Sequence, residues 1–369
     1  MNEQAPIPPD KNRPRRVLIV RIGAMGDVLH AMPAVTALRE RHPDWFIGWA
    51  IDPVWSELLH TASECGASSL VRGAAMPLID RCYPVPTRDW KRRPFSLETL
   101  DEIRSLRRQL RAEQFDLCVD LQGAIRSSAT GRLAGAKKFA GPAHPREKQA
   151  RWLYGLPIET HAAHVIEQAC EILGAAVGEP LAPAKIELPL DTAAEAWRDD
   201  LLSQLFSGTT AQKFVIIAPA AGWGAKQWPA ERYGAVAAQL AQAGYLPLVN
   251  AVVAGDILAN AVVDASGGTA VVVPCTVGQL IALTRRASLV IAGDTGPLHL
   301  AAALDRPVVA LFGPTDPARN GPYGTDSRVL RHPSSRKDHT RYAETEEGLM
   351  HVETDAVVAA AFDLLRATA

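Results

Sequence analysis

The chain has 369 residues, 47% of them hydrophobic, and a formal net charge of −1 at pH 7. This length suits two domains, each with enough apolar residues for a core, and the near-neutral charge argues against a nucleic-acid-binding protein. The sequence shows no recognisable leader and no apolar run of about 18 residues, and its five scattered cysteines form no CxxC pair. We therefore expect a cytoplasmic protein without membrane spans, disulfides or a zinc site.

The first segment, residues 1–16, is rich in proline and polar residues and predicts a disordered tail. Its basic side chains are Lys11, Arg13, Arg15 and Arg16. They could contact an anionic membrane surface, at about 1 kcal/mol for each charge, or simply be solvated, as most charge runs are.

The next segment predicts an apolar strand at residues 17–20, the loop IGAMGD and an amphipathic helix. In that helix apolar residues recur at a spacing near 3.6, at Val28, Leu29, Met32, Val35 and Leu38. Asp27 stands at the turn between the strand and the helix. It either caps the helix or presents a carboxylate to a cleft, and the sequence leaves both alternatives open.

A second strand, glycine-containing loop and amphipathic helix begin at residue 213 with KFVIIAPAAGWGAKQWPAERYGAVAAQL. Further apolar runs that predict buried strands are FIGWAID, FDLCVDL, LPLVNAVV, TAVVVP, SLVIAGD and PVVALFG. Helical segments separate many of these runs, which indicates parallel sheets covered on both faces. The predicted fold class is α/β, with two Rossmann-like doubly wound domains that face each other across a cleft.

A stretch rich in proline, alanine and glycine sets the expected domain boundary. We expect an N-terminal domain at residues 17–182, an interdomain linker region at 183–212, a C-terminal domain at 213–348 and a C-terminal helix at 349–369 that packs near the boundary. Because ligands bind doubly wound sheets at the carboxyl ends of the strands, the loops of both domains should line one cleft.

The loop GDTGPLHLAAAL in the second domain predicts a phosphate site. Asp294, Thr295 and Gly296 form a tight turn after a strand, and the proline that follows suits the first turn of a helix. The free amides and the positive end of that helix would attract an anion, and His299 in the first turn could reach the same anion. The alternative is a capped helix with a histidine packed on its side.

The loop PAAGWGAKQW predicts a second anion-binding device in the same domain. Lys226 follows several small residues, Gly222 among them, so that backbone amides and an ammonium could converge on one diphosphate. The loop is not a Walker A sequence, because the GxxxxGK[ST] spacing is absent. Taken alone, the lysine is better explained as a solvated surface residue.

These motifs together resemble glycosyltransferase family 9, the lipopolysaccharide heptosyltransferases. The matching segments are RVLIVRIGAMGDVLHAMPAV, FDLCVDLQGAIRSS, AKQWPAERY, GDTGPLHLAAALDRPVVALFGPTDP and GPYG, in family order. The resemblance implies a GT-B fold and an inverting enzyme that moves heptose from ADP-L-glycero-D-manno-heptose onto the lipopolysaccharide inner core. It implies a protein of the bacterial cytoplasm, either free or peripheral at the cytoplasmic face of the inner membrane. Another nucleotide-sugar donor remains an alternative.

The resemblance also assigns roles. It implies that Asp27 is the catalytic base, that Lys226 contacts the donor phosphate, and that the donor-binding block is Asp294, Thr295, Gly296 and His299. No DxD tripeptide occurs in the chain, and a lysine with a helix N-terminus can stabilise the departing diphosphate. We therefore expect no catalytic metal and no cofactor beyond the nucleotide-sugar substrate.

For the acceptor, the resemblance implies an anionic glycan core, which basic side chains would bind. The candidates are Gln122, Arg126, Arg146 and Arg151, and an ordinary solvated surface is the alternative. The segment LVNAVVAGDILANAVV departs from the family pattern of a glycine-containing turn with an acidic residue, for which Asp256 is the candidate.

Three other function classes are alternatives to the transferase. A nucleotide-sugar epimerase on the same GT-B architecture would act on the donor without an acceptor. A non-catalytic nucleotide-sugar-binding module would have no need of the carboxylate of Asp27. A dehydrogenase is disfavoured because the first loop lacks the third glycine of a dinucleotide fingerprint.

Overall fold

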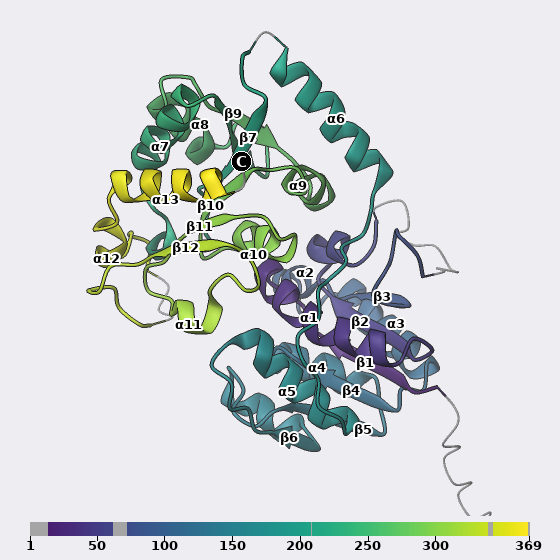
Figure 1. Ribbon diagram of the computed structural model, residues 1–369. Coiled ribbons are helices and arrows are strands. Elements are labelled where there is room, and N and C mark those ends of the chain that lie inside the picture. The colour runs from purple at the N-terminus through teal and green to yellow at the C-terminus, as the bar shows by residue number, and fades with distance from the viewer. Residues whose placement is uncertain (1–13, 62–71, 208, 339–341, 368–369) are drawn as a thin grey trace, which may run out of the picture.

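The computed structural model describes residues 14–61, 72–207, 209–338 and 342–367. They form two lobes, each built on a parallel six-stranded sheet with helices on both faces (Figure 1). The predicted α/β class with two doubly wound units is therefore confirmed. No helix in these ranges is long and apolar enough to cross a membrane.

The first sheet has the strand order β3-β2-β1-β4-β5-β6. Its strands are β1 (Arg16–Val20), β2 (Phe46–Ile51), β3 (Arg81–Pro84), β4 (Leu117–Asp120), β5 (Lys138–Pro142) and β6 (Leu156–Ile158). Its helices are α1 (Met25–Arg41), α2 (Thr87–Arg92), α3 (Leu97–Ala112), α4 (Ile125–Leu133) and α5 (Val165–Val177), with 3₁₀ turns η1 (Pro53–Leu58) and η3 (Lys148–Leu153).

The second sheet has the order β12-β11-β10-β7-β8-β9, which repeats the order of the first sheet when its strands are counted from β7. Its strands are β7 (Lys213–Ala218), β8 (Tyr245–Ala251), β9 (Val271–Pro274), β10 (Leu289–Gly293), β11 (Val308–Leu311) and β12 (Ser327–Leu330). The remaining helices are α6 (Thr192–Phe206), η4 (Gly224–Lys226), α7 (Ala230–Gln242), α8 (Ile257–Ala265), α9 (Val277–Thr284), α10 (Gly296–Ala303), α11 (Pro317–Asn320), α12 (Glu347–Met350) and α13 (Thr354–Ala367).

The central strands consist of apolar residues, and the side chains on both of their faces are buried. In β1, Val17 and Ile19 join one hydrophobic cluster, whereas Leu18 and Val20 join the cluster on the opposite face. β7 divides its side chains between two clusters in the same way. Continuous apolar strands of this kind are typical of parallel sheets, which is why runs such as VLIV were readable from the sequence.

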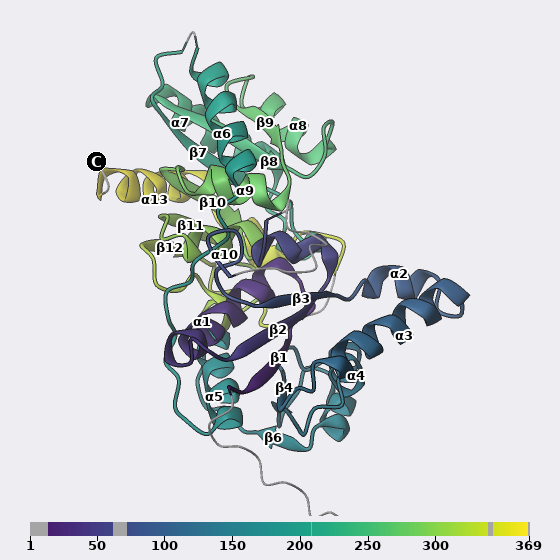
Figure 2. The ribbon, with the colours of Figure 1, turned by 90° about the vertical axis from the view of Figure 1, so that its right-hand side faces the viewer.

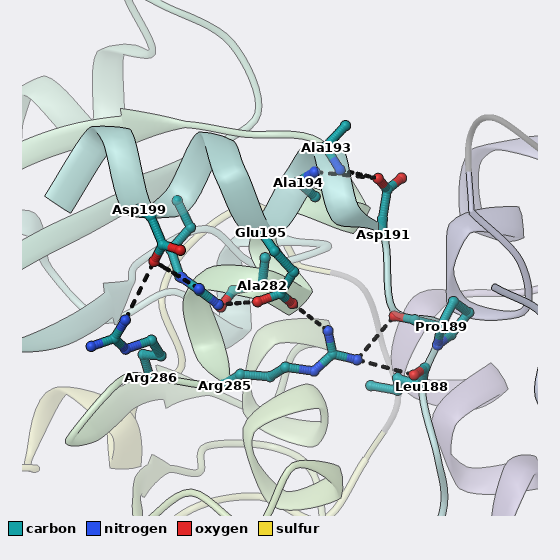
Figure 3. A network of polar contacts seen from close by, with 11 residues as sticks. Leu188, Pro189, Asp191, Ala193, Ala194, Glu195, Asp199, Ala282, Arg285 and Arg286 are labelled. Carbon is teal, nitrogen blue, oxygen red and sulfur yellow. Dashed lines mark hydrogen bonds and ion pairs between the residues drawn. The ribbon is translucent and has the colours of Figure 1, made fainter. Parts of the chain in front are cut away.

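The segment expected to be a linker, residues 183–212, contains the helix α6. A polar network fastens this helix to α9 of the second lobe (Figure 3). Arg285 at the end of α9 donates to the carbonyls of Leu188 and Pro189, at 3.0 and 2.9 Å, and pairs with Glu195 of α6 at 2.5 Å. The chain between the lobes is therefore held against the C-terminal lobe.

Two details of the predicted boundaries need correction. Residues 1–13 of the predicted tail lie outside the described residues, but Arg16 is the first residue of β1 and pairs with Glu113, and Arg15 donates to the carbonyl of Val177 at 3.1 Å. At the other end, α13 packs on α7 and on the second sheet, and its apolar residues belong to the core of that lobe. The C-terminal helix is thus a core element of its domain, not a helix at the boundary, because its apolar face fits the open face of the second sheet.

Candidate active site

The predicted site residues gather where the strand order of each sheet reverses. In the first sheet β1 and β4 are neighbours; Asp27 follows β1 in the first turn of α1, and Gln122 lies in the loop after β4. In the second sheet β7 and β10 are neighbours, and the loops after them carry Lys226 and Asp294. Connections run in opposite directions at such a point, which leaves a crevice outside the carboxyl ends of the strands.

Asp27 lies in the first turn of α1, and its carboxylate is bound on both oxygens. Oδ2 accepts a hydrogen bond from the Ala24 amide at 3.2 Å, and Oδ1 pairs with Nη2 of Arg21 at 2.9 Å. The side chain nevertheless remains 39% exposed. Asp27 therefore stabilises the helix N-terminus and presents a carboxylate to solvent, so that the two sequence-based alternatives do not exclude each other.

A cation from the second lobe lies within electrostatic range of Asp27. The pKa of Arg319, on the short helix α11, is lowered first by desolvation and then by the charge of Arg21, whereas Asp27 opposes this effect. Two guanidinium groups, one from each lobe, thus accompany the carboxylate. Arg319 is not recognisable as a site residue from the sequence, because it lies far from Asp27 along the chain and belongs to no motif.

The second lobe brings three predicted donor-site residues together in one buried network. Lys226 forms an ion pair with Oδ2 of Asp294 and donates to the Asp294 carbonyl at 3.3 Å, and its ammonium lies 4.4 Å from the centre of the Trp223 ring. His299 Nε2 lies 3.0 Å from Oδ1 of Asp294. Burial raises the pKa of Asp294, but the hydrogen bond with His299 and the charge of Lys226 outweigh it, so that the pKa lies well below its usual range.

The first turn of α10 has the free amides that the sequence predicted. Thr295 is the N-terminal flanking residue, but its hydroxyl lies 3.3 Å from the Gly293 carbonyl and makes no capping bond to the helix. Unpaired amides at a helix N-terminus attract anions. Gly222, in the loop before Lys226, is exposed, with open space where a Cβ atom would be.

A buried histidine pair joins the two lobes at this point. His30 Nε2, on α1, lies 3.1 Å from Nδ1 of His299, on α10. Burial, then the neighbouring His299, lowers the pKa of His30 well below its usual value, which favours the neutral ring. Both ring nitrogens of His299 are therefore occupied by protein groups. In this arrangement His299 contacts Asp294 and His30, and its contact with the donor anion stays a prediction.

Two glycines of the quoted motifs allow the lobes to approach each other. A Cβ atom on Gly26 would lie 2.6 Å from the ring of His299, and a Cβ atom on Gly296 would lie 2.6 Å from the sulfur of Met25. The MGD and DTG loops therefore interlock across the lobe interface. This contact brings the Asp27 turn next to the Lys226–Asp294–His299 network.

The predicted acceptor residues do not form one cluster of contacts. The side chain of Gln122 is buried, and its Oε1 accepts a hydrogen bond from the Ile22 amide at 2.8 Å, so that it holds the loop that leads to Asp27. Arg126 and Arg146 are exposed and Arg151 is half-buried. Within the described ranges these three arginines form no ion pair, which leaves their charges available to solvent or ligand.

Two further points concern the divergent segment and the question of a metal site. Asp256, the candidate acidic residue of the divergent segment, caps α8 by accepting from the Ala259 amide at 2.9 Å. Among the described residues, no group of three or more histidine, cysteine, aspartate or glutamate side chains could hold a metal ion.

Comparison with known proteins gives concordant results. The model of "Glycosyltransferase family 9 (heptosyltransferase)" matches residues 103–351. The chain is 29% identical to lipopolysaccharide heptosyltransferase 1 of Escherichia coli K12, over 86% of this chain and 94% of that protein. It is 26% identical to the Pseudomonas aeruginosa protein of the same name, over 84% and 81% of the two chains. The solved structure "E. coli heptosyltransferase WaaC with ADP" superposes with a TM-score of 0.72 at 25% identity and covers 95% of this chain and 99% of that chain.

Proposed function

The chain belongs to glycosyltransferase family 9, whose model matches more than half of its length, and from this premise we propose that it transfers heptose from ADP-heptose to the inner core of lipopolysaccharide. The relatives named above are lipopolysaccharide heptosyltransferases, and one of them was solved with ADP. The alternative of an epimerase receives no support from these relatives.

One observation carries the proposal: the switch points of two Rossmann-like sheets meet, with a carboxylate on one side and a phosphate-binding device on the other. Gly26, next to Asp27, lies against His299, which holds Asp294. Asp294 in turn holds Lys226. A donor diphosphate on the second lobe and an acceptor hydroxyl on the first lobe would therefore be neighbours, as a direct transfer requires.

In the proposed reaction Asp27 is the general base. Each carboxylate oxygen has two lone pairs, and the contacts with Ala24 and Arg21 use one on each oxygen, so that a lone pair remains to accept a proton. The acceptor oxygen forms a bond to the anomeric carbon of the sugar as its proton passes to Asp27. The bond from that carbon to the diphosphate oxygen breaks on the opposite face, which inverts the anomeric centre and releases ADP.

In the same reaction the second lobe stabilises the negative charge of the departing ADP. The ammonium of Lys226 has three N–H groups, and two of them contact Asp294, so that one remains for a phosphate oxygen. The free amides of α10 and the positive end of its dipole supply further charge stabilisation. We assign Asp294 and His299 to positioning: they fix the ammonium, and His30 fixes His299 from the other lobe.

The acceptor side of the proposal rests on exposed basic residues of the first lobe. Arg126 and Arg146 lie after the ends of β4 and β5, at the same edge of the sheet as the Asp27 loop. Their free guanidinium groups suit phosphate or carboxylate groups of an inner core. A peripheral position at the inner membrane follows from the membrane-bound nature of such an acceptor.

A two-armed assay tests this function. The purified chain is incubated with ADP-heptose and either a heptose-deficient lipopolysaccharide acceptor or no acceptor. We expect release of ADP and a heptosylated acceptor only in the first arm. Conversion of the donor to an isomer in the second arm would establish the epimerase instead, and turnover with another nucleotide-sugar alone would overturn the donor assignment.

A further inference from the structure

The hairpin made by α2 and α3 exposes large apolar side chains at its tip. Phe95 is 92% exposed and Leu97 is 77% exposed, and Leu100, one turn further along α3, is 38% exposed. Figure 2 shows this hairpin projecting from the N-terminal lobe. Single exposed apolar residues are ordinary on protein surfaces, but a cluster at the end of a projecting element marks an interaction site.

The same hairpin is strongly basic, although the whole chain has a net charge of −1. Residues 87–112 contain eight basic and four acidic residues. Three of the acidic residues are in exposed ion pairs with arginine, and the fourth, Glu102, accepts from Trp90. Within the part of the chain that the structure describes, Lys91, Arg107 and Arg108 have no acidic partner. The hairpin therefore keeps a net positive surface.

The apolar and basic residues of α3 follow one another along a single outer stripe. The buried residues of α3 are Thr99, Leu106 and Leu110, which face the lobe. On the exposed side a spacing of three or four residues connects Leu97, Leu100, Arg104, Arg107 and Arg111. A bilayer surface has acyl chains below anionic headgroups. The apolar end of this stripe suits the acyl chains, and the arginines that follow suit the headgroups.

The base of the hairpin borders the candidate active site. The guanidinium of Arg88, on α2, lies 5.9 Å from the centre of the Trp55 ring. A Cβ atom on Gly23 would lie 2.8 Å from that same ring, and Gly23 belongs to the loop that leads to Asp27 in the first turn of α1. One tryptophan thus separates the base of the hairpin from the catalytic loop, so that whatever binds the tip is brought close to the site.

We propose that the α2–α3 hairpin docks the enzyme on an anionic phospholipid bilayer, with Phe95 and Leu97 inserted among the lipids and the free basic residues on the headgroups. This inference deepens the proposed function, because it names the surface that brings the site to a membrane-bound acceptor. A second copy of the chain is disfavoured as the occupant, since an isologous contact would bring two net-positive hairpins together.

Binding of the full chain to vesicles tests the proposal without donor or acceptor, so that its outcome is independent of the glycosyltransferase assay. The probes are phosphatidylcholine vesicles with and without roughly one third phosphatidylglycerol, in sedimentation experiments. We expect strong preference for the anionic vesicles. The variant Phe95→Ser/Leu97→Ser should bind them about 10- to 100-fold more weakly. The variant Lys91→Gln/Arg108→Gln should lose roughly fivefold for each charge removed.

Two control variants locate the effect. Val252 and Ile257 of the C-terminal lobe are 81% and 88% exposed. The variant Val252→Ser/Ile257→Ser therefore removes two exposed apolar side chains that do not belong to the basic α2–α3 hairpin. Lys11→Gln/Arg13→Gln removes charge from the N-terminal segment. Both should retain vesicle binding, and all variants should keep the native thermal midpoint, because the altered side chains on the lobes are exposed.

Several results would overturn the proposal. Equal binding of the tip variant and the native chain would exclude insertion of Phe95 and Leu97. Loss of binding in the Lys11→Gln/Arg13→Gln variant alone would assign the contact to the N-terminal segment. A native dimer in analytical ultracentrifugation that becomes a monomer in the tip variant would make the hairpin an interface between copies.

Discussion

Replacement of Lys226 by methionine should destabilise the C-terminal lobe as well as weaken donor binding. The side chains of Lys226 and Asp294 are only 11% and 6% exposed, so the variant leaves a buried carboxylate without its main counter-charge. Breaking a buried pair in this way typically costs about 3–5 kcal/mol. At about 2–4 °C for each kcal/mol, the thermal midpoint should fall by roughly 6–20 °C.

The pH dependence of stability follows from the direction of the Asp294 pKa. That pKa is depressed in the folded protein, so the ionised group stabilises the fold above about pH 4 and this contribution is lost as the pH falls through the folded-state pKa. In Lys226→Met, burial is opposed mainly by His299, and the folded-state pKa rises. The folded-state and unfolded-state pKa values then differ less, so the loss of stability in acid should be smaller in the variant than in the native protein.

Two further variants separate stability from catalysis. Lys337→Met removes the lysine of an exposed pair with Asp316, whose side chains are 65% and 34% exposed, and should cost less than about 1 kcal/mol. Lys226→Met/Asp294→Asn removes both charges of this buried pair and should recover part of the stability. It should still bind ADP about 10- to 150-fold more weakly, because the bond from the ammonium to phosphate is absent.

Thermal and chemical unfolding over a pH series, with calorimetric titration of ADP, measures these effects. The reasoning is refuted if Lys226→Met costs no more stability than Lys337→Met, since the ion pair would then be of no more consequence than a surface pair. It is equally refuted if the double variant regains native affinity for ADP, because Lys226 would then act on the donor only through the fold.

Three other predictions concern the same cleft. Asp27→Asn should lower turnover by about 10²–10⁴-fold while ADP affinity changes little, and a near-native rate would leave Asp27 as a helix-stabilising residue only. Transferase activity should survive excess EDTA, because Lys226 and the amides of α10 meet the diphosphate charge; a loss that magnesium reverses would contradict this. Gly26→Ala should cost about 1–3 kcal/mol, since its Cβ atom would lie 2.6 Å from the His299 ring. The matched substitution Gly222→Ala meets open space and should be neutral, and equal unfolding free energies of the two variants would remove the argument for interlocked loops.

The sequence by itself determined the central part of the fold. Residues 17–20, 214–218 and 289–292 are apolar because they are buried on both faces of parallel sheets, and this pattern is visible without coordinates. The helices α1 and α7 follow from their apolar spacing. The loops with Asp27 and with Asp294 were found because a strand, a short polar turn and a helix are consecutive in the chain, so that their arrangement is local.

Shorter or more polar elements were not recognised from the sequence. β3, β5, β6 and β12 have three to five residues and contain proline or charged side chains, and they become strands because a neighbouring strand supplies their hydrogen bonds. The helix α6 lay within the predicted linker. Arg285 and Arg198 hold it to α9, and such contacts between distant residues leave no periodic signal in the sequence.

Only the tertiary structure decided how the site residues divide their tasks. His299 belongs to a motif that predicts phosphate binding. Its ring nevertheless lies between His30 and Asp294, which are 269 and 5 residues away along the chain. Gln122 looked available to an acceptor, yet it binds the Ile22 amide. The residue types of a site can be recognised from the sequence where consecutive residues form the motif. The partner of each side chain, in contrast, depends on how the two lobes pack together, and this is set by the packing of α1 against α10.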